Sequence, residues 1–487
     1  MANRGNILSS IDWLTIALYL IMIFFGWVNI YGATYNFEQT SMVNLSNPAG
    51  KQFMWIGVSL VIAITILIID YKTYDFFAYA IYIFWILVLI ATPIIAAKTH
   101  GDIKGSLSWI KIRTISFQPA EWAKFITALC LAKWMSRYDF KITDWRSMVV
   151  PLGIICIPMF IIMVLQKETG TALVFAAFFL VLYREGMSGY IIAGVIAFAL
   201  LFIISIKYMP AALPLGSGNW GIILSCTGLY IVILTLILFK EYLKLQTIII
   251  ASVIAATYAI STLLSIWIKV NFTIVSACLI GGCIIFLIIE AIYLRRKSLI
   301  ILSLFTILTA ASCFSSSKIF SHLPDHQRKR VEVTLKMRQD PSGVEYNTIQ
   351  AKIAIGSGGF TGKGYLHGTQ TTLNFVPEQH TDFIFCTVGE EFGFIGTFGV
   401  LIVYLIFILR LIQLSERQKD MFSQIYGYSV TCIFIIHLII NIGMVLGLLP
   451  VIGIPLPFYS YGGSSLMGFT ILLFIFIKLD SSRVEKL

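Results

Sequence analysis

The residues of this chain best suited to chemistry lie in one long polar loop between Ser321 and Thr387. Within it Asp340 begins an Asp-Pro-Ser-Gly turn, in which aspartate accepts local backbone hydrogen bonds, proline fixes φ and glycine allows positive φ. Asp340 is therefore either a turn-former or a carboxylate held at a rigid corner beside basic residues, where it would suit the role of a general base. The local sequence leaves both interpretations open.

Basic side chains accompany Asp340 in this loop and also occur in an earlier polar segment. They are Lys98, Lys104, Lys111, Arg113, Arg328, Lys329, Arg330, Lys336, Arg338, Lys352 and Lys363. Arginine and lysine together suit phosphate or pyrophosphate, so these residues indicate an anionic ligand. The charge of long loops is only loosely constrained in membrane proteins, so a purely structural interpretation also stands.

A glycine-rich run from Gly356 to Gly364 follows in the same loop. Its backbone N–H groups would be able to cradle a phosphate, or its glycines would let helices pack closely. The run is not a Walker A loop, because Ser357 and Gly364 occupy positions where that motif needs glycine and a hydroxyl residue.

Carboxylates and one histidine close the loop at Glu378, His380 and Asp382. A lone histidine among carboxylates is more often a hydrogen-bonding partner than a metal ligand. The sequence contains no HExxH motif and no cysteine or histidine spacing typical of metal sites. These residues therefore do not predict a histidine-bound metal, and we assign no metal ligands.

Three further ionisable residues lie within or beside apolar stretches, where they are costly and usually face a cavity or a partner. Glu121 and Lys124 are three residues apart, so on a helix they share a face and can pair. Glu168 lies at a hairpin expected on the same side of the membrane as the loop.

Membrane-spanning helices must position all of these residues. The chain is 58% hydrophobic and 12% charged, whereas soluble domains are nearer half apolar and a quarter charged. Its apolar runs, such as 53–70 and 272–294, are continuous rather than alternating, which indicates helices and not a β-barrel.

The first apolar stretch, 11–34, is longer than the apolar part of a signal peptide, so we interpret it as a retained helix. The eight cysteines lie almost all in such runs and are expected to be small buried apolar residues.

We predict an all-α polytopic protein of about 14 spans with both termini cytoplasmic. The predicted spans are 11–34, 53–70, 73–97, 119–137, 147–165, 169–184, 188–208, 219–240, 246–268, 272–294, 298–320, 387–410, 424–449 and 459–479. Lysine and arginine gather in one alternate set of connections, which assigns that set to the cytoplasm and the long loop to the outside. The net charge of +11 is explained by anchoring to anionic lipid. Nucleic-acid binding is not expected, because no nucleic-acid-binding module is present.

Four segments resemble the SEDS family (shape, elongation, division and sporulation), which are polytopic peptidoglycan polymerases. The segments are 117–124 (QPAEWAK with its preceding Phe117), 165–171, 350–383 and 441–465. Within the family, Gly362-Lys363-Gly364 and Gly368-Thr369-Gln370 resemble the elongation branch, the rod-shape-determining RodA type, more than the division (FtsW) branch.

The resemblance implies a glycosyltransferase that polymerises lipid II on the outer face of the bacterial cytoplasmic membrane during cell elongation. The family's essential loop aspartate falls on Asp340, which would take the proton from the acceptor sugar. The implied partners are a class B penicillin-binding protein (a transpeptidase), the elongation machinery and membrane lipids. No cofactor is certain, and a divalent cation, Mg²⁺ or Mn²⁺, is the one candidate. A lipid II flippase and a non-catalytic scaffold for the penicillin-binding protein are the alternatives.

Twelve residues are expected to wall the lipid II site together with Asp340. They are Lys352, Glu121, Lys124, Glu168, Lys111, Arg113, Arg328, Arg330, Glu378, His380, Asp382 and Ser460.

The chain departs from the family pattern at four places, one of which is Val344-Glu345 in place of a small, Gly-containing pair before Tyr346. Ser108 stands where the family has an arginine, and Lys167-Glu168 replaces a Pro-Asp pair. Family members commonly have about ten spans, so about four here are additional. We therefore expect one SEDS-type membrane domain over 1–487, an insertion of extra helices at 210–300 and an extracytoplasmic catalytic loop at 321–387.

Overall fold

The computed structural model describes residues 10–35, 41–99, 106–112, 115–138, 140, 145–211, 213, 217–239, 243–323, 325–338 and 345–484. The chain divides into two compact units. Unit 1 comprises Met1–Met187 and Asp340–Leu487, and unit 2 comprises Ser188–Gln339. The predicted insertion at 210–300 falls inside unit 2, while the predicted loop at 321–387 contributes to both units.

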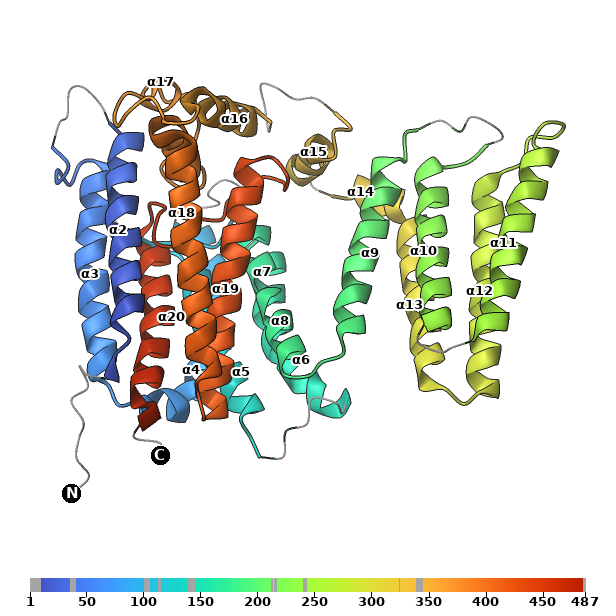
Figure 1. The fold of residues 1–487 in the computed structure, drawn as a ribbon, viewed down its shortest axis with the longest axis horizontal. Coiled ribbons are helices and arrows are strands. Elements are labelled where there is room, and N and C mark those ends of the chain that lie inside the picture. The colour runs from blue at the N-terminus through green and yellow to red at the C-terminus, as the bar shows by residue number, and fades with distance from the viewer. Residues whose placement is uncertain are drawn as a thin grey trace. The chain divides into compact units, whose positions relative to one another are not determined.

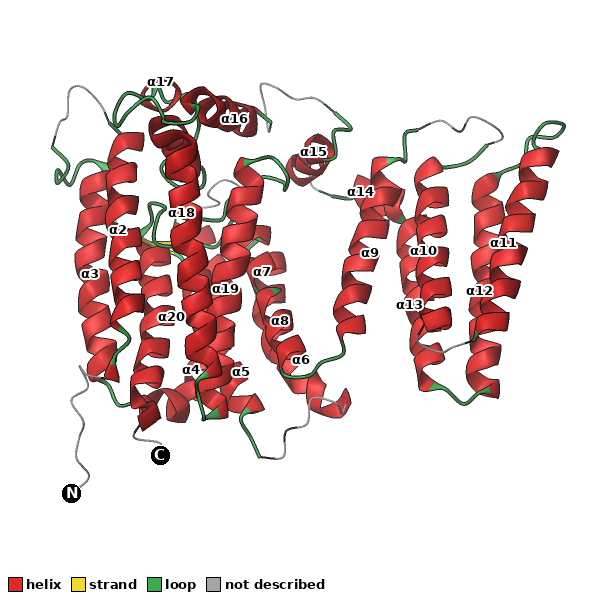
Figure 2. Cartoon of the chain, viewed as in Figure 1, coloured by secondary structure: helices red, strands yellow, loops and turns green. Residues whose placement is uncertain are grey.

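Unit 1 is built almost entirely from helices (Figure 2). Its helices are α2 (Trp13–Ala33), α3 (Pro48–Ile68), α4 (Tyr71–Thr99), α5 (Pro119–Met135), α6 (Trp145–Phe160), the π-helical turn η1 (Ile161–Leu165), α7 (Thr169–Val174), α8 (Ala177–Arg184), α16 (Tyr346–Gly358), α17 (Thr369–Thr372), α18 (Ile384–Glu416), α19 (Met421–Val445), α20 (Gly463–Ser481) and the 3₁₀ turn η2 (Ser482–Val484). Two short strands, β1 (Ile110–Ile112) and β2 (Ile115–Phe117), pair antiparallel just before α5.

Unit 2 contains α9 (Gly189–Lys207), α10 (Trp220–Phe239), α11 (Lys244–Leu264), α12 (Phe272–Tyr293), α13 (Lys297–Phe314), α14 (Ser316–Ser321) and α15 (Asp325–Thr334). Helices α9, α10, α12 and α13 pack around one apolar core that includes Leu229, Ile233, Ile280 and Leu287. Helix α11 packs against α10 and α12.

Local signals in the sequence explain where several helices of unit 1 begin. Asp12 caps α2, because its carboxylate accepts hydrogen bonds from the backbone N–H (3.1 Å) and the hydroxyl (2.6 Å) of Thr15. Pro48 and Pro119 open α3 and α5, where the missing N–H of proline costs nothing.

Helices α5 and α20 lie in the interior of unit 1. Almost every residue of both helices is buried, and α20 packs against α3, α5 and α19 (Figure 1). A helix that is apolar on all sides finds its place in the middle of a bundle. The candidate polar residues on α5 are therefore held inside the protein and not on its lipid-facing surface.

Twelve helices in the described part of the chain are long and apolar enough to cross a membrane. This confirms the prediction of an all-α polytopic protein. The predicted spans 119–137 and 169–184 correspond to the 17-residue α5 and to the pair α7 and α8, which are shorter. The total of about fourteen crossings and the cytoplasmic side of the termini stay predictions.

An ionic network joins the beginning of α2 to the ends of α18 and α20, which lie at the same end of unit 1 (Figure 1). Arg410 pairs with Asp12, and its Nε lies 3.2 Å from Asp12 Oδ2. Arg417 pairs with Asp480, and its Nε lies 2.8 Å from Asp480 Oδ1. Burial raises the pKa of Asp12, but hydrogen bonds from Arg410 and Thr15 outweigh burial and lower it to about 2.

This depressed pKa predicts how Asp12→Asn affects stability. The stabilisation by the carboxylate is present above the ordinary pKa of 3.8 and is lost as pH falls towards the folded value of about 2. At neutral pH the variant should lose on the order of 2 kcal/mol of unfolding free energy, although asparagine can still cap α2. Unfolding of both proteins in detergent between neutral and acidic pH checks this, and a difference that persists unchanged at the lowest pH contradicts it.

Candidate functional site

A buried ion pair on α5 is the centre of the candidate site. Lys124 Nζ lies 2.8 Å from Glu121 Oε2, and each side chain is less than 5% exposed. The same Nζ lies 3.0 Å from His437 Nε2 on α19 and 4.7 Å from the ring centroid of Phe469 on α20. Helices α5, α19 and α20 therefore meet around one ammonium group.

The hydrogen bonds of His437 fix which of its ring nitrogens carries the proton. Nδ1 lies 3.3 Å from the backbone oxygen of Pro455, and a carbonyl oxygen can only accept, so Nδ1 is the donor. Nε2 is then free to accept a hydrogen bond from Lys124. The sequence analysis missed His437. The one signal that could have identified it is that an ionisable side chain stands inside an apolar span.

Glu168 lies between η1 and α7, close enough to Glu121 and Lys124 for their charges to interact. Its Oε1 accepts hydrogen bonds from Gln118 Nε2 and Thr171 Oγ1, both at 2.5 Å. Its Oε2 is buried and has no hydrogen-bond partner among the described residues. Burial raises the pKa of Glu168, and the hydroxyl groups of Ser108 and Thr171 oppose that shift. Glu168 is therefore the acid of this network that keeps one oxygen without a protein partner in the described chain.

The segment that carries Ser108 lies directly beside Glu168. Ser108 is fully buried, and its hydroxyl lies 2.7 Å from Ser106 Oγ. The backbone N–H of Leu107 donates to the oxygen of Gln166 at 2.9 Å, which ties this segment to the turn before Glu168. This chain thus places a neutral hydroxyl where the resemblance would place an arginine.

The glycine-rich run packs against a break in α18. Gly393 has φ 60° and ψ −153°, which interrupts the helix, and the backbone N–H of Phe394 donates to the oxygen of Gly359 at 2.9 Å. A Cβ on Gly358 would stand 2.0 Å from the backbone oxygen of Gly389. Of the two interpretations of this run, the structure supports close packing of backbone against backbone.

A second buried ion pair joins the loop to α18. Lys363 Nζ lies 2.7 Å from Glu390 Oε1, and the Glu390 side chain is fully buried. The backbone N–H groups of Thr369, Gln370 and Thr371 also donate to this carboxylate at 2.8 to 2.9 Å. Glu390 therefore neutralises Lys363 and caps α17, a role that the sequence analysis did not recognise.

The end of the loop is held by the segment that follows α19. The backbone N–H of Tyr461 donates to the oxygen of His380 at 2.9 Å, and the two rings lie 5.5 Å apart. Asn441 Nδ2 donates to the backbone oxygens of Asp382 and Ile454 at 2.8 and 2.7 Å. Two segments that resemble the SEDS family, distant in sequence, thus form one wall.

Three other predicted site residues make local contacts in this wall. A Cβ on Gly447 would stand 2.4 Å from Lys352 Nζ, so the lysine lies over the turn after α19. Ser460 Oγ accepts from the backbone N–H of Leu456 at 2.8 Å and shapes its own turn. Glu378 Oε2 accepts a hydrogen bond from Thr381 Oγ1 at 3.1 Å.

The remaining described residues of the predicted site are on β1 and α15. Lys111 is exposed on β1, opposite Ser116. Arg328 and Arg330 lie on α15 of unit 2, where Arg328 Nε pairs with Glu332 Oε1 at 2.9 Å.

Asp340 and Arg113 lie outside the described residues, so their predicted roles stay predictions. The structure brings together Glu121, Lys124 and Glu168 in one network, and His380 and Asp382 in one wall. Substrate binding by any of these residues stays a prediction. In the described ranges, no group of three or more His, Cys, Asp or Glu side chains could hold a metal ion.

The sequence of the chain matches one family model and several known proteins. A family model described as "Cell cycle protein" (FTSW_RODA_SPOVE) matches residues 12–214 and 227–485. The peptidoglycan glycosyltransferase MrdB of Escherichia coli is 47% identical over 148 residues, which is 30% of this chain and only 40% of that protein. The peptidoglycan glycosyltransferase RodA of Treponema pallidum is 27% identical over 96% of both chains.

Solved structures share the fold. A chain from a peptidoglycan synthase complex, studied for the coordination of polymerisation and crosslinking, matches with a TM-score of 0.60 at 19% identity over 97% of this chain and 98% of that chain. The rod-shape-determining protein RodA of Thermus thermophilus matches with a TM-score of 0.54 at 18% identity over 97% of both chains.

The buried network predicts a non-additive effect of two substitutions. Lys124→Met leaves the Glu121 carboxylate buried without its partner and should cost about 3 to 5 kcal/mol of unfolding free energy. Adding Glu121→Gln removes that stranded charge and should restore part of the loss. Unfolding in detergent measures both, with the exposed Lys51→Met as a control that should stay within about 0.5 kcal/mol of wild type. Equal losses in the single and double variants contradict the pairing.

Proposed function

Because the chain belongs to the FtsW/RodA/SpoVE family, the SEDS family named above, we propose that it is a RodA-type peptidoglycan glycosyltransferase. In this proposal it polymerises lipid II on the outer face of the bacterial cytoplasmic membrane during cell elongation. The observation that carries the proposal is the network of Glu121, Lys124, His437 and Glu168 inside an apolar bundle. Charged groups at membrane depth are costly and mark functional sites.

Relatives support both the activity and the elongation branch. The Treponema relative, named RodA and a peptidoglycan glycosyltransferase, aligns along almost the whole of both chains. The Escherichia coli MrdB relative is more similar but only over part of its length.

The proposed reaction forms one glycosidic bond and breaks one bond to phosphate. The 4-hydroxyl oxygen of the acceptor sugar attacks the anomeric carbon of the donor, and Asp340 takes the hydroxyl proton. The bond from that carbon to the pyrophosphate oxygen breaks, and undecaprenyl pyrophosphate leaves with the electron pair. Basic residues near the outer surface, such as Lys352 and Lys111, suit the charge that develops on the leaving group.

The described polar groups suit different tasks in this reaction. Lys124 already interacts with Glu121, His437 and the Phe469 ring, so we assign it the task of holding α5, α19 and α20 in register. Glu168 has a buried oxygen without a partner in the described chain, so we assign it the task of accepting a hydrogen bond from a sugar hydroxyl or amide.

A class B penicillin-binding protein is the proposed partner, since the matching peptidoglycan synthase complex couples polymerisation to crosslinking. The elongation machinery and membrane lipids complete the proposed surroundings. A divalent cation, Mg²⁺ or Mn²⁺, would help to neutralise the pyrophosphate. The described carboxylates do not form a ligand set for it, so no step of the proposal depends on a metal.

The general-base assignment predicts that Asp340→Ala lowers the rate of glycan synthesis about 10²- to 10⁴-fold. The assay follows polymerisation of labelled lipid II by the purified protein with and without its penicillin-binding protein. Unchanged binding of the partner by the variant controls for folding.

Full polymerisation by the partner-bound variant would refute the catalytic role of Asp340. Translocation of labelled lipid II by the protein alone in liposomes would instead favour the flippase alternative.

His437 predicts a second, independent effect on this activity. His437→Leu removes the acceptor for Lys124 and should lower the polymerisation rate about 10- to 100-fold. This ratio corresponds to the free energy of a hydrogen bond to a charged group. His437→Gln keeps an acceptor oxygen and should retain most of the rate. Measured kcat and KM should show the loss in His437→Leu and its rescue in His437→Gln, whereas equal loss in both variants would mean that the hydrogen bond to Lys124 does not account for the loss.

A further inference from the structure

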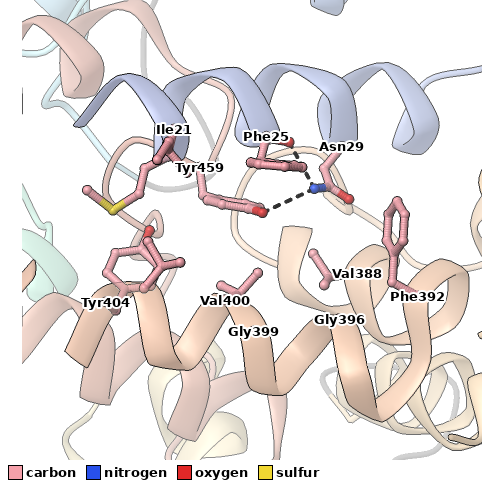
Figure 3. A pocket seen from close by; sticks show the side chains of 12 residues that line it. Ile21, Phe25, Asn29, Val388, Phe392, Gly396, Gly399, Val400, Tyr404 and Tyr459 are labelled. Carbon is pink, nitrogen blue, oxygen red and sulfur yellow. Dashed lines mark hydrogen bonds between the residues drawn. The ribbon is translucent and has the colours of Figure 1, made fainter. Parts of the chain in front are cut away.

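An apolar cavity of about 280 Å³ lies between α2 and α18 in unit 1 (Figure 3). Phe25 and Met22 line it on α2, and Val388, Phe392 and Val400 line it on α18. The cavity shares no lining residue with the network around Lys124. Its volume is close to the lower end of the range for ligand pockets, which begins at about 300 Å³.

One buried polar group at the end of this cavity has an unmet hydrogen bond. Asn29 is only 2% exposed, and its Oδ1 has no hydrogen-bond partner among the described residues. An unsatisfied buried amide oxygen costs about 1 to 3 kcal/mol. Such a group at the wall of a cavity calls for a hydrogen-bond donor from outside the described chain.

The orientation of this amide is determined by its neighbours. Asn29 Nδ2 donates to the backbone oxygen of Phe25 at 2.9 Å and to the Tyr459 hydroxyl at 3.4 Å (Figure 3). Because a backbone oxygen can only accept, the nitrogen must lie on that side and the oxygen on the other. The Tyr459 hydroxyl accepts from Asn29 and keeps its own proton to donate. This end of the cavity therefore offers both an acceptor and a donor.

The rest of the cavity is apolar, and exposed apolar side chains border it. Phe25 and Ile21 line it and are 50% and 42% exposed. Gly396 and Gly399 line the α18 side, and a Cβ on Gly399 would meet no atom within 4 Å. Asn29 lies in the last turns of α2, whereas Ile21 lies about two turns earlier, so the polar end is nearer the predicted outer surface.

We propose that this cavity binds one acyl chain of a membrane glycerolipid whose headgroup hydroxyl donates a hydrogen bond to Asn29 Oδ1. The polarity of the site matches that of a lipid standing in the outer leaflet, with its polar end at Asn29 and its chain running towards Ile21. The lipid enters sideways from the bilayer, past Phe25.

A partner helix is a poorer match to the same cavity. A helix is about 10 Å wide, and its backbone N–H groups are already used within the helix, so it has no backbone donor for Asn29. A water molecule would satisfy Asn29, but it would leave the apolar part of the cavity unfilled. An alkyl chain with a hydroxyl at its end meets both requirements.

The test uses photolabelling of the full-length protein in phosphatidylcholine nanodiscs. The probe is a diacylglycerol with a diazirine in one chain, and its matched control is the same molecule with the free hydroxyl methylated. Mass spectrometry of the peptides that contain residues 21–29 and 388–404 measures the labelling. The diacylglycerol should label these peptides about fivefold more than its methyl ether. This ratio corresponds to the loss of one hydrogen bond of about 1 kcal/mol.

Two variants separate the chain site from the polar contact. Gly399→Leu fills the cavity and should lower labelling by the diacylglycerol about tenfold, as expected for a loss of about 1.4 kcal/mol. Gly57→Leu is its matched control, because Gly57 is also a helix glycine at which an added Cβ would meet no atom within 4 Å; its labelling should equal that of wild type. Asn29→Leu should make the diacylglycerol and its methyl ether label equally.

Three outcomes would overturn the proposal. The first is equal labelling of wild type and Gly399→Leu. The second is equal labelling of wild type by the two probes, which would mean that water alone satisfies Asn29. The third is loss of labelling on addition of the penicillin-binding protein, together with crosslinks from its transmembrane helix to Phe25, which would assign the cavity to that partner.

Discussion

The ammonium group of Lys124 remains inside an apolar bundle because three different groups surround it. Glu121 supplies the opposite charge, His437 supplies a lone pair and Phe469 supplies the face of a ring. Removing a charge from water costs several kcal/mol, and only close partners offset that cost. Each partner stands at a different point around the ammonium group, so the position of Lys124 depends on the packing of α5, α19 and α20. The charge of Glu168 interacts with those of Glu121 and Lys124. The position of its oxygen without a partner therefore depends on the same helix packing.

Backbone contacts impose a second constraint, at the N-terminal end of α18. Gly358 and Gly393 bring the loop and the helix so close that side chains would not fit. Glu390 then satisfies both the Lys363 ammonium and the N–H groups of α17. These contacts bind the residues after α16 firmly to unit 1. A rigid support of this kind suits a loop that must hold substrate groups in fixed positions.

The cavity beside α2 shows a different use of a polar group at membrane depth. Asn29 donates to Phe25 and Tyr459 through its nitrogen, and only its oxygen has an unmet bond. Glu121, Lys124 and His437 satisfy one another, whereas Asn29 Oδ1 has no partner among the described residues. The unmet bond of Asn29 is what suggests an occupant for the cavity from outside the protein.

The sequence by itself determined the fold class, because long continuous apolar runs have no other stable solution in a membrane than helices. It also predicted that Glu121 pairs with Lys124, since a spacing of three residues on a helix settles that contact locally. The family resemblance identified the segments that meet in space, such as the loop end and the turn at Tyr461. Asp340, Arg113 and the number of spans stay predictions.

Only the tertiary structure decided the partners that come from distant helices. His437 joins Lys124 across more than three hundred positions of sequence, and no periodicity predicts which of many apolar helices will lie beside α5. The glycine-rich run was equally compatible with phosphate binding and with packing, until the break at Gly393 placed another backbone against it. Contacts within one helix follow from its fixed geometry, whereas contacts between helices depend on how all the side chains fit together at once.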